Sequence, residues 1–156
     1  MIQQKVVDII PESGYQGEVY DQWVVVAIDK SKLKVFDNTA IAASETCVGS
    51  ECELTLLARP SEVELIEEQQ CMVELDCQED PVFTGRVVDT AVDDVWHTPP
   101  GKPLISLDIG LGEILVHPTN KLGELIESDK VEPGSYLRVI TYRIDLLDIV
   151  GVGTKQ

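Results

Sequence analysis

The sequence predicts an all-β protein with one or two short helices, built as a small OB-like or Greek-key barrel. Apolar and polar residues alternate near the C-terminus, where Ile140, Tyr142, Ile144 and Leu146 are interleaved with polar side chains. A period of two is typical of a half-buried strand. Similar short patterns recur along most of the chain, and only two brief segments have helical spacing.

The first part of the chain predicts strands separated by turns. Pro11 and the Glu12-Ser13-Gly14 segment end the first strand, and residues 38–51 are small and polar, which predicts a long loop. Residues 23–28 form an unbroken apolar run rich in β-branched side chains, which is typical of a central strand buried on both faces. The predicted strands here are 6–10, 15–20, 23–28, 33–36 and 52–58.

Two segments predict helices. Ser61-Glu62-Val63-Glu64 matches a capping box after Pro60, with acidic residues in the first turn, so we expect a helix that ends near Gln70. A second helix is expected over 119–127, where Leu122, Leu125 and Ile126 have helical spacing.

The second part of the chain also predicts strands. A loop over 93–103 carries the Pro99-Pro100-Gly101 turn, and residues 132–135 form a strong turn. Breaks in the alternation at Val139-Ile140 and Leu146-Leu147 predict bulges. The predicted strands are 71–77, 83–89, 104–111, 114–116 and a series between 136 and 150.

The four cysteines favour a core role over a metal site. Cys52 is in phase with Leu54 and Leu56, and Cys71 and Cys77 are in phase with Val73 and Leu75. One regular strand would hold the Cys71 and Cys77 sulfurs roughly 20 Å apart, too far to share an ion. We expect these three thiols to pack as small hydrophobes. Cys47 lies in a loop, and its reactivity is left open.

The chain has the length of one compact unit, 1–156, and an internal echo supports an alternative. Residues 15–21 and 83–89 share the pattern aromatic-x-Gly-x-Val-x-Asp. Each opens a series of strands that reaches a short helix and then more strand, which is the order of an OB-fold. The alternative is a duplication into two barrel-like lobes, 1–78 and 79–156.

Composition restricts the classes of partner. The chain has 28 acidic and 12 basic residues, a net charge of −16 and a pI near 4.3. Such a field repels phosphate backbones, which disfavours nucleic acid and favours basic partners or divalent cations. No apolar stretch approaches the ~20 residues that span a bilayer, and no secretory signal precedes the strands, so we expect a cytoplasmic protein without membrane contact.

The loop at 93–97 is the leading candidate site. It brings together Asp93, Asp94, Trp96 and His97. Carboxylates and a neutral imidazole can share a divalent cation, so Asp93, Asp94 and His97 are candidate metal ligands, and an exposed Trp can anchor a partner. The alternative is an ordinary loop whose Trp covers an open barrel end.

Other chemical signals are weak. His117 has Glu113 four residues earlier, but a general base needs a partner in space. Nucleophile-elbow, zinc-protease, phosphate-loop and dinucleotide motifs are absent from the sequence, and no cofactor is expected. Arg138 and Arg143 flank the last strands, where a local basic patch would suit single-stranded nucleic acid.

The sequence therefore favours a non-enzymatic binding or assembly module with an acidic surface, which binds a protein partner or self-associates through a strand edge or apolar patch. One alternative is a metal-assisted enzyme that uses the 93–97 loop. A second is an OB-like protein that binds single-stranded nucleic acid.

Overall fold

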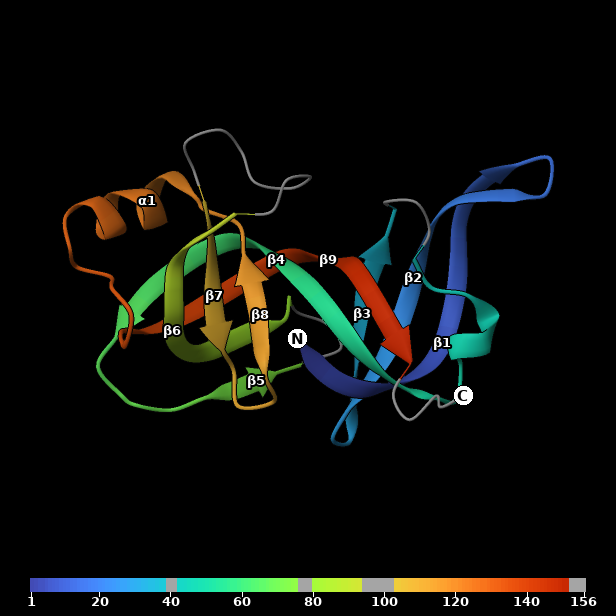
Figure 1. The fold of residues 1–156 in the computed structure, drawn as a ribbon, viewed down its shortest axis with the longest axis horizontal. Helices are drawn as coiled ribbons and strands as arrows, with labels where there is room; N and C mark the ends of the chain where they lie inside the picture. Colours follow the sequence, from blue (N-terminus) through green and yellow to red (C-terminus); the bar gives the residue numbers. More distant parts are fainter. Residues whose placement is uncertain (39–41, 76–79, 94–102, 152–156) are drawn as a thin grey trace. The chain divides into compact units, whose positions relative to one another are not determined.

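The computed structural model describes residues 1–38, 42–75, 80–93 and 103–151. These ranges are mostly strand, as the sequence predicts, with a single α-helix among them (Figure 1). The chain forms two compact units, Met1–Leu57 with Arg143–Gln156 (unit 1) and Ala58–Tyr142 (unit 2). The elements are β1 Ile2–Tyr15, β2 Glu18–Ile28, β3 Ser31–Asp37, the 3-10 turn η1 Glu45–Cys47, β4 Glu51–Ile66, β5 Met72–Glu74, β6 Val82–Val92, β7 Leu104–Asp108, β8 Glu113–Val116, α1 Asn120–Glu127 and β9 Tyr136–Gly151.

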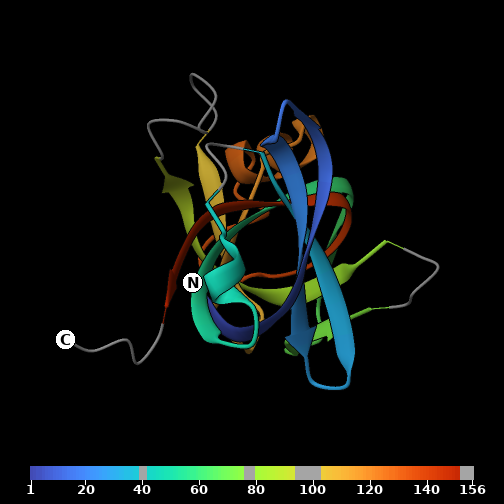
Figure 2. The same cartoon turned by 90° about the vertical axis from the view of Figure 1, so that its right-hand side faces the viewer.

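Unit 1 is built on the antiparallel neighbours β1, β2 and β3. β3 also pairs in parallel with β9 through Phe36 and Asp145, and residues 2–5 of β1 pair with residues 51–54 of β4. The β1–β2 and β2–β3 turns lie at opposite ends of β2, and η1 lies beside the beginning of β1 (Figure 2). The core contains Ile2, Val6, Val24, Val26, Leu33, Val35, Leu54, Ile144 and Leu146. β2 is the central strand that its apolar run predicts.

Unit 2 is built on β6, β7 and β8, which are antiparallel neighbours, with α1 following β8. Residues 82–86 of β6 pair with residues 136–140 of β9, and the short β5 pairs with the same part of β6. The predicted second helix is confirmed: the Thr119 hydroxyl caps it by accepting from the Leu122 amide at 3.1 Å. The core contains Val63, Phe83, Val87, Leu104, Ile105, Leu107, Ile114, Val116, Leu122, Leu137 and Val139.

The predicted first helix is wrong, because residues 61–66 continue β4. The Ser61 hydroxyl does not cap a helix; it donates to the Ile140 carbonyl of β9 at 3.2 Å. Glu64 faces Arg138 of β9 at 3.9 Å. A capping box is a local signal of about 1 kcal/mol, and pairing with a strand that lies far away in the sequence outweighs it.

The sequence pattern puts Ile140 and Tyr142 on the buried face of the C-terminal strand, and this prediction is wrong. Leu137, Val139 and Thr141 point into unit 2, and Tyr142 is 60% exposed, whereas Ile144 and Leu146 are buried in unit 1. The alternation therefore changes phase between Thr141 and Ile144, where β9 passes from one unit to the other, and not at Val139-Ile140. The burial pattern agrees with the second predicted change, at Leu146-Leu147, because Leu147 and Ile149 are half-buried while Asp148 and Val150 are exposed. One strand serves two cores, so one uninterrupted period cannot describe it.

The cysteine predictions are partly confirmed. Cys52 is buried with Leu54 and Leu56, as its phase predicts. Cys71 is exposed, which corrects its assignment to the core, because β5 covers only residues 72–74 and Cys71 precedes it. Its thiol donates to the Asp108 carbonyl at 3.3 Å. Cys77 lies outside the described residues.

The two segments of the sequence echo occupy different positions. Gly17 lies in the turn between β1 and β2 with φ +85°, whereas Gly85 lies inside β6. The two segments with the shared pattern, 15–21 and 83–89, therefore do not occupy equivalent positions in two strands. Within the ranges that the structure covers, no helix is long and apolar enough to span a lipid bilayer.

Candidate functional site

Most of the predicted 93–97 site lies outside the described residues. Asp93 is exposed at the end of β6, and Asp94, Trp96 and His97 belong to the part of the chain that is not described. Among the residues that are described, no three His, Cys, Asp or Glu side chains gather closely enough to hold a metal ion. The metal assignment of this loop stays a prediction.

Unit 2 contains a cavity of about 450 Å³ beside α1. Thr90 and Pro103, which precede and follow the predicted loop, contribute to its wall. The remaining wall comes from the beginning and the exposed side of the helix, namely Pro118, Thr119, Asn120, Gly123, Glu124, Ile126 and Glu127. Neutral and acidic groups line this cavity in the described part of the chain.

Glu113 begins β8, and His117 follows the end of that strand. The Glu113 carboxylate accepts a short hydrogen bond from the Ser106 hydroxyl at 2.6 Å, which occupies it within the β7–β8 hairpin. The His117 amide donates to the Ala58 carbonyl at 2.9 Å and so ends β8. These contacts give both residues structural roles.

A cluster of aromatic and cationic side chains lies on the outer face of unit 1. We call Trp23, Lys34, Phe36 and Arg143 the aromatic cluster. The Trp23 and Phe36 rings have centroids 4.8 Å apart and are tilted by 49°. The Lys34 ammonium lies 4.9 Å from the Trp23 ring centroid, and the Arg143 guanidinium carbon lies 5.2 Å from that of Phe36. Each ring thus has its own cation, at a distance typical of a cation–π contact.

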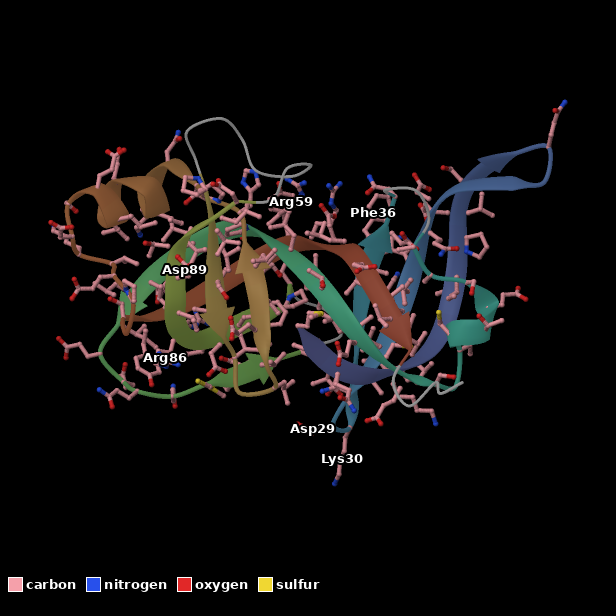
Figure 3. All side chains as sticks on the ribbon, in the orientation of Figure 1. Asp29, Lys30, Phe36, Arg59, Arg86 and Asp89 are labelled. Atoms are coloured by element: carbon pink, nitrogen blue, oxygen red, sulfur yellow. The ribbon has the colours of Figure 1, made fainter. Side chains whose placement is uncertain are left out.

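Strand register creates this cluster. Trp23 of β2 pairs directly with Phe36 of β3, and Phe36 pairs with Asp145 of β9. Val24 and Val35 turn into the core because successive side chains of a strand point to opposite faces. Trp23, Phe36 and Arg143 are therefore half-buried on the solvent side. Figure 3 shows Phe36 at one end of β3 and the Asp29–Lys30 turn at the other.

Acidic groups hold two members of the aromatic cluster in place. The Arg143 guanidinium donates from Nη2 to Asp145 Oδ2 at 3.2 Å, and its Nε lies 2.7 Å from Oδ1 as an ion pair. Asp145 is only 5% exposed, so this ion pair is shielded from water on the carboxylate side. The Trp23 indole donates to the Glu12 carboxylate of β1 at 3.0 Å. Both contacts restrict the rotamers of the side chains that form the cluster.

A buried polar group supports the same strands from inside. Asp37, fully buried at the end of β3, accepts from the Gln22 side-chain amide at 2.9 Å and from the backbone amides of Ala42 and Ala43 at 2.8 and 2.9 Å. Gln22 also donates to the Ala43 carbonyl at 2.9 Å. This network attaches residues 42–43 to Gln22 of β2 and to the end of β3, and the Gln22–Asp37 pair is next to the Trp23–Phe36 pair in the register.

The cysteines differ in environment. Burial raises the pKa of the Cys52 thiol, and the nearby Cys47 thiol raises it further by charge and by a shared hydrogen bond. A raised pKa means less thiolate at any given pH, and the thiolate is the reactive form. Cys47 is half-buried and Cys71 is exposed.

We expect alkylation of the native protein at neutral pH to label Cys71 first, Cys47 more slowly and Cys52 last. Iodoacetamide labelling followed by peptide mass spectrometry measures this order. In denaturant the three rates should converge, because the difference comes from the fold. Labelling of native Cys52 as fast as Cys71 would contradict the burial described for β4.

Sequence reasoning named Arg143 but missed its aromatic partners. In the sequence Trp23 and Phe36 are apolar residues of two predicted strands. Their contact depends on the β2–β3 register, which the sequence does not determine. A usable signal existed: Lys32 and Lys34 alternate with Leu33 and Val35, which places cations and Phe36 on the same outer face. The other predicted arginine, Arg138, faces Glu64 in unit 2 and is not part of this cluster.

Comparisons with known protein families, with curated proteins and with solved structures return no match for this chain.

Proposed function

We propose that this protein is a non-enzymatic binding module that holds a polypeptide partner on the aromatic cluster of unit 1. The observation that carries the proposal is the half-exposed Trp23–Phe36 pair with Lys34 and Arg143 over its rings. Trp and Arg are enriched among the few residues that dominate interface energy. Aromatic rings stack on flat or apolar groups of a ligand, and ammonium and guanidinium groups pair with its acceptors. These are binding interactions and involve no reaction.

An OB-like barrel is the architecture we propose for unit 1. The neighbours run β1-β2-β3-β9-β4, and β4 pairs again with β1. With β9 taken as the fifth strand, the order and the parallel β3–β9 pairing match a five-stranded Greek-key barrel. In OB-folds the face of the second and third strands is the one that binds oligonucleotides and oligosaccharides. Trp23 and Phe36 lie on these two strands, which supports the choice of site.

We extend the proposal to a duplication. The series β1-β2-β3-η1-β4 is followed by β6-β7-β8-α1-β9, which has the same order of strands and helix. A second set of neighbouring strands runs β9-β4-β8-β7-β6, and β6 pairs again with β9, which closes the order. In this arrangement each long strand, β4 and β9, is the fourth strand of one lobe and the fifth strand of the other. This supports two barrel-like lobes.

The charges favour a polypeptide over a nucleic acid. Lys34 and Arg143 are accompanied by Glu12 and Asp145, so the cluster and its immediate surroundings carry as many carboxylates as cations. A phosphate backbone needs several unopposed Lys or Arg contacts. A peptide with both charged and aromatic side chains can satisfy this mixed surface. The edge strand β5 has only three residues, so it offers little for self-association.

The test is selection of peptide ligands from a displayed library, followed by titration calorimetry. We expect selected peptides to lose about 30-fold or more in affinity on Trp23→Ala, the loss typical of a central hot-spot residue, and to be weakened by Lys34→Glu. Tyr142→Ala is the matched control, because Tyr142 is an exposed aromatic residue of unit 2. Thermal unfolding of each variant separates lost binding from lost folding.

Two outcomes would overturn the proposal. Selected peptides that bind Trp23→Ala and Lys34→Glu as tightly as the parent protein would place binding elsewhere. Retardation of single-stranded oligonucleotides at low salt, weakened by Arg143→Glu or Arg138→Glu, would assign the protein to nucleic-acid binding instead.

A further inference from the structure

The β1–β2 hairpin extends as an arm past the other strands of unit 1 (Figure 1). Pairing of β1 with β4 ends at Lys5, and pairing of β2 with β3 begins at Gln22. Residues 13–15 of β1 and 18–21 of β2 therefore pair only with each other within the described part of the chain, whereas residues 8–11 of β1 pair with residues 22–25 of β2, which also pair with β3. We call residues 8–21 the arm. The outer edge of its first strand, residues 8–13, has no strand beside it among the pairings of the described residues.

Such an edge is physically incomplete. Its outward N–H and C=O groups form a template for another strand. At the tip of the arm, where residues 13–15 pair only with residues 18–21, the ribbon is two-stranded and marginally stable in water, and a third strand stabilises it. Ile10 of β1 is 41% exposed, so a strand added beside β1 would also cover apolar surface.

The charge of the arm selects the occupant of this edge. The arm contains Asp8, Glu12, Glu18 and Asp21, and no Lys, Arg or His stands between Lys5 and Lys30 in the sequence. Two of the arm carboxylates accept from neutral donors: the Ser13 hydroxyl donates to Asp21 at 2.7 Å and the Trp23 indole donates to Glu12 at 3.0 Å. A second copy of the arm would oppose like charges, which is destabilising between paired strands. A basic strand would pair favourably.

We propose that the outer edge of β1 at residues 8–13 accepts an extended, lysine- or arginine-containing segment of a partner protein as an added strand. This inference rests on the proposed function, because the Trp23–Glu12 hydrogen bond joins the arm to the aromatic cluster. Backbone pairing supplies affinity, and alternate basic side chains of the segment face the arm carboxylates and supply specificity. Pro11 and the register shifts on either side of it shorten the edge, which limits pairing between copies of this chain.

The test uses three synthetic peptides titrated into the full chain. The first alternates Lys with Val and Thr, the second has Glu at each Lys position, and the third has Pro at its centre and cannot complete a strand. We expect the Lys peptide to bind, the other two to bind at least tenfold more weakly, and added salt to weaken the Lys peptide. Amide hydrogen exchange at residues 8–13 should slow when it is bound.

Charge variants locate the site. Asp8→Lys should weaken the Lys peptide roughly tenfold, whereas Glu127→Lys, the same charge change on the exposed side of α1, should leave its affinity unchanged. Equal binding of the Glu or Pro peptide, or equal weakening by both variants, would overturn the inference. If the Lys peptide fails to bind while library-selected peptides still depend on Trp23, the edge proposal fails alone. If selected peptides ignore Trp23 but the Lys peptide protects residues 8–13, the cluster proposal fails alone.

Discussion

Replacing Gly85 with alanine is expected to destabilise the protein by about 2–3 kcal/mol or more, as overpacking of a core does. Gly85 is buried in β6, where β7 passes very closely. An added Cβ would overlap the Asp108 carbonyl oxygen and would lie 2.8 Å from its carbonyl carbon and 3.2 Å from Ile109 Cα. These are backbone atoms, so the strand itself would have to move. Urea unfolding followed by circular dichroism measures the change.

Gly123→Ala is the matched control for that experiment. Gly123 lies in α1, and a Cβ there meets no atom within 4 Å. Alanine removes the entropic cost of glycine in a helix, so this variant should be more stable than the parent by about 0.5–1 kcal/mol. The same chemical change should thus have opposite signs at the two positions. A Gly85→Ala protein that unfolds at the parent's urea concentration would contradict the close approach of β6 and β7.

Asp37→Ala is expected to cost about 3 kcal/mol or more, because each buried polar group left without a partner costs about 1–3 kcal/mol. The substitution removes the acceptor of the Gln22 side-chain amide and of the Ala42 and Ala43 amides. Asp37→Asn should lie between alanine and the parent, because an amide oxygen can still accept while its NH₂ opposes the remaining donors. Thermal unfolding with calorimetry gives the values.

Asp29→Asn serves as the control for the Asp37 variants. Asp29 is exposed in the β2–β3 turn with φ +53°, a conformation that Asn tolerates as well as Asp does. We expect a change within about 0.5 kcal/mol there, as for most surface positions. Equal effects at Asp29 and Asp37 would show that the loss of a negative charge, and not the buried network, determines stability.

The local signals predicted much of the fold. Alternation identified most strands, the apolar run of β2 identified a central strand, and Leu122, Leu125 and Ile126 identified α1. Two of the failures share one cause. The capping box at Ser61 and the phase of Tyr142 were interpreted locally, whereas β4 and β9 each contribute to two units. Burial of such a strand is decided separately by each unit, and no single period records the change.

The candidate site was less predictable than the fold. The sequence predicts a site at the 93–97 loop because two carboxylates, an indole and an imidazole are neighbours there. The structure describes only Asp93 of these residues. The aromatic cluster joins residues 23, 34, 36 and 143, which come from three strands. Arg143 was identified as a flanking cation, but the ring beneath it was not, because a ring–cation contact across strands depends on register.

By itself the sequence determined that this chain is mostly strand, that Cys52 packs inside and that the stretch from Val6 to Asp29 carries only negative charge, because periodicity and composition are properties of neighbouring residues. The tertiary structure decided which strands pair, which face of each long strand is covered, and that Trp23, Phe36 and Arg143 meet. The physical reason is that strand pairing joins residues far apart in the sequence. The free energy of that pairing and burial exceeds the local preferences that a sequence pattern reports.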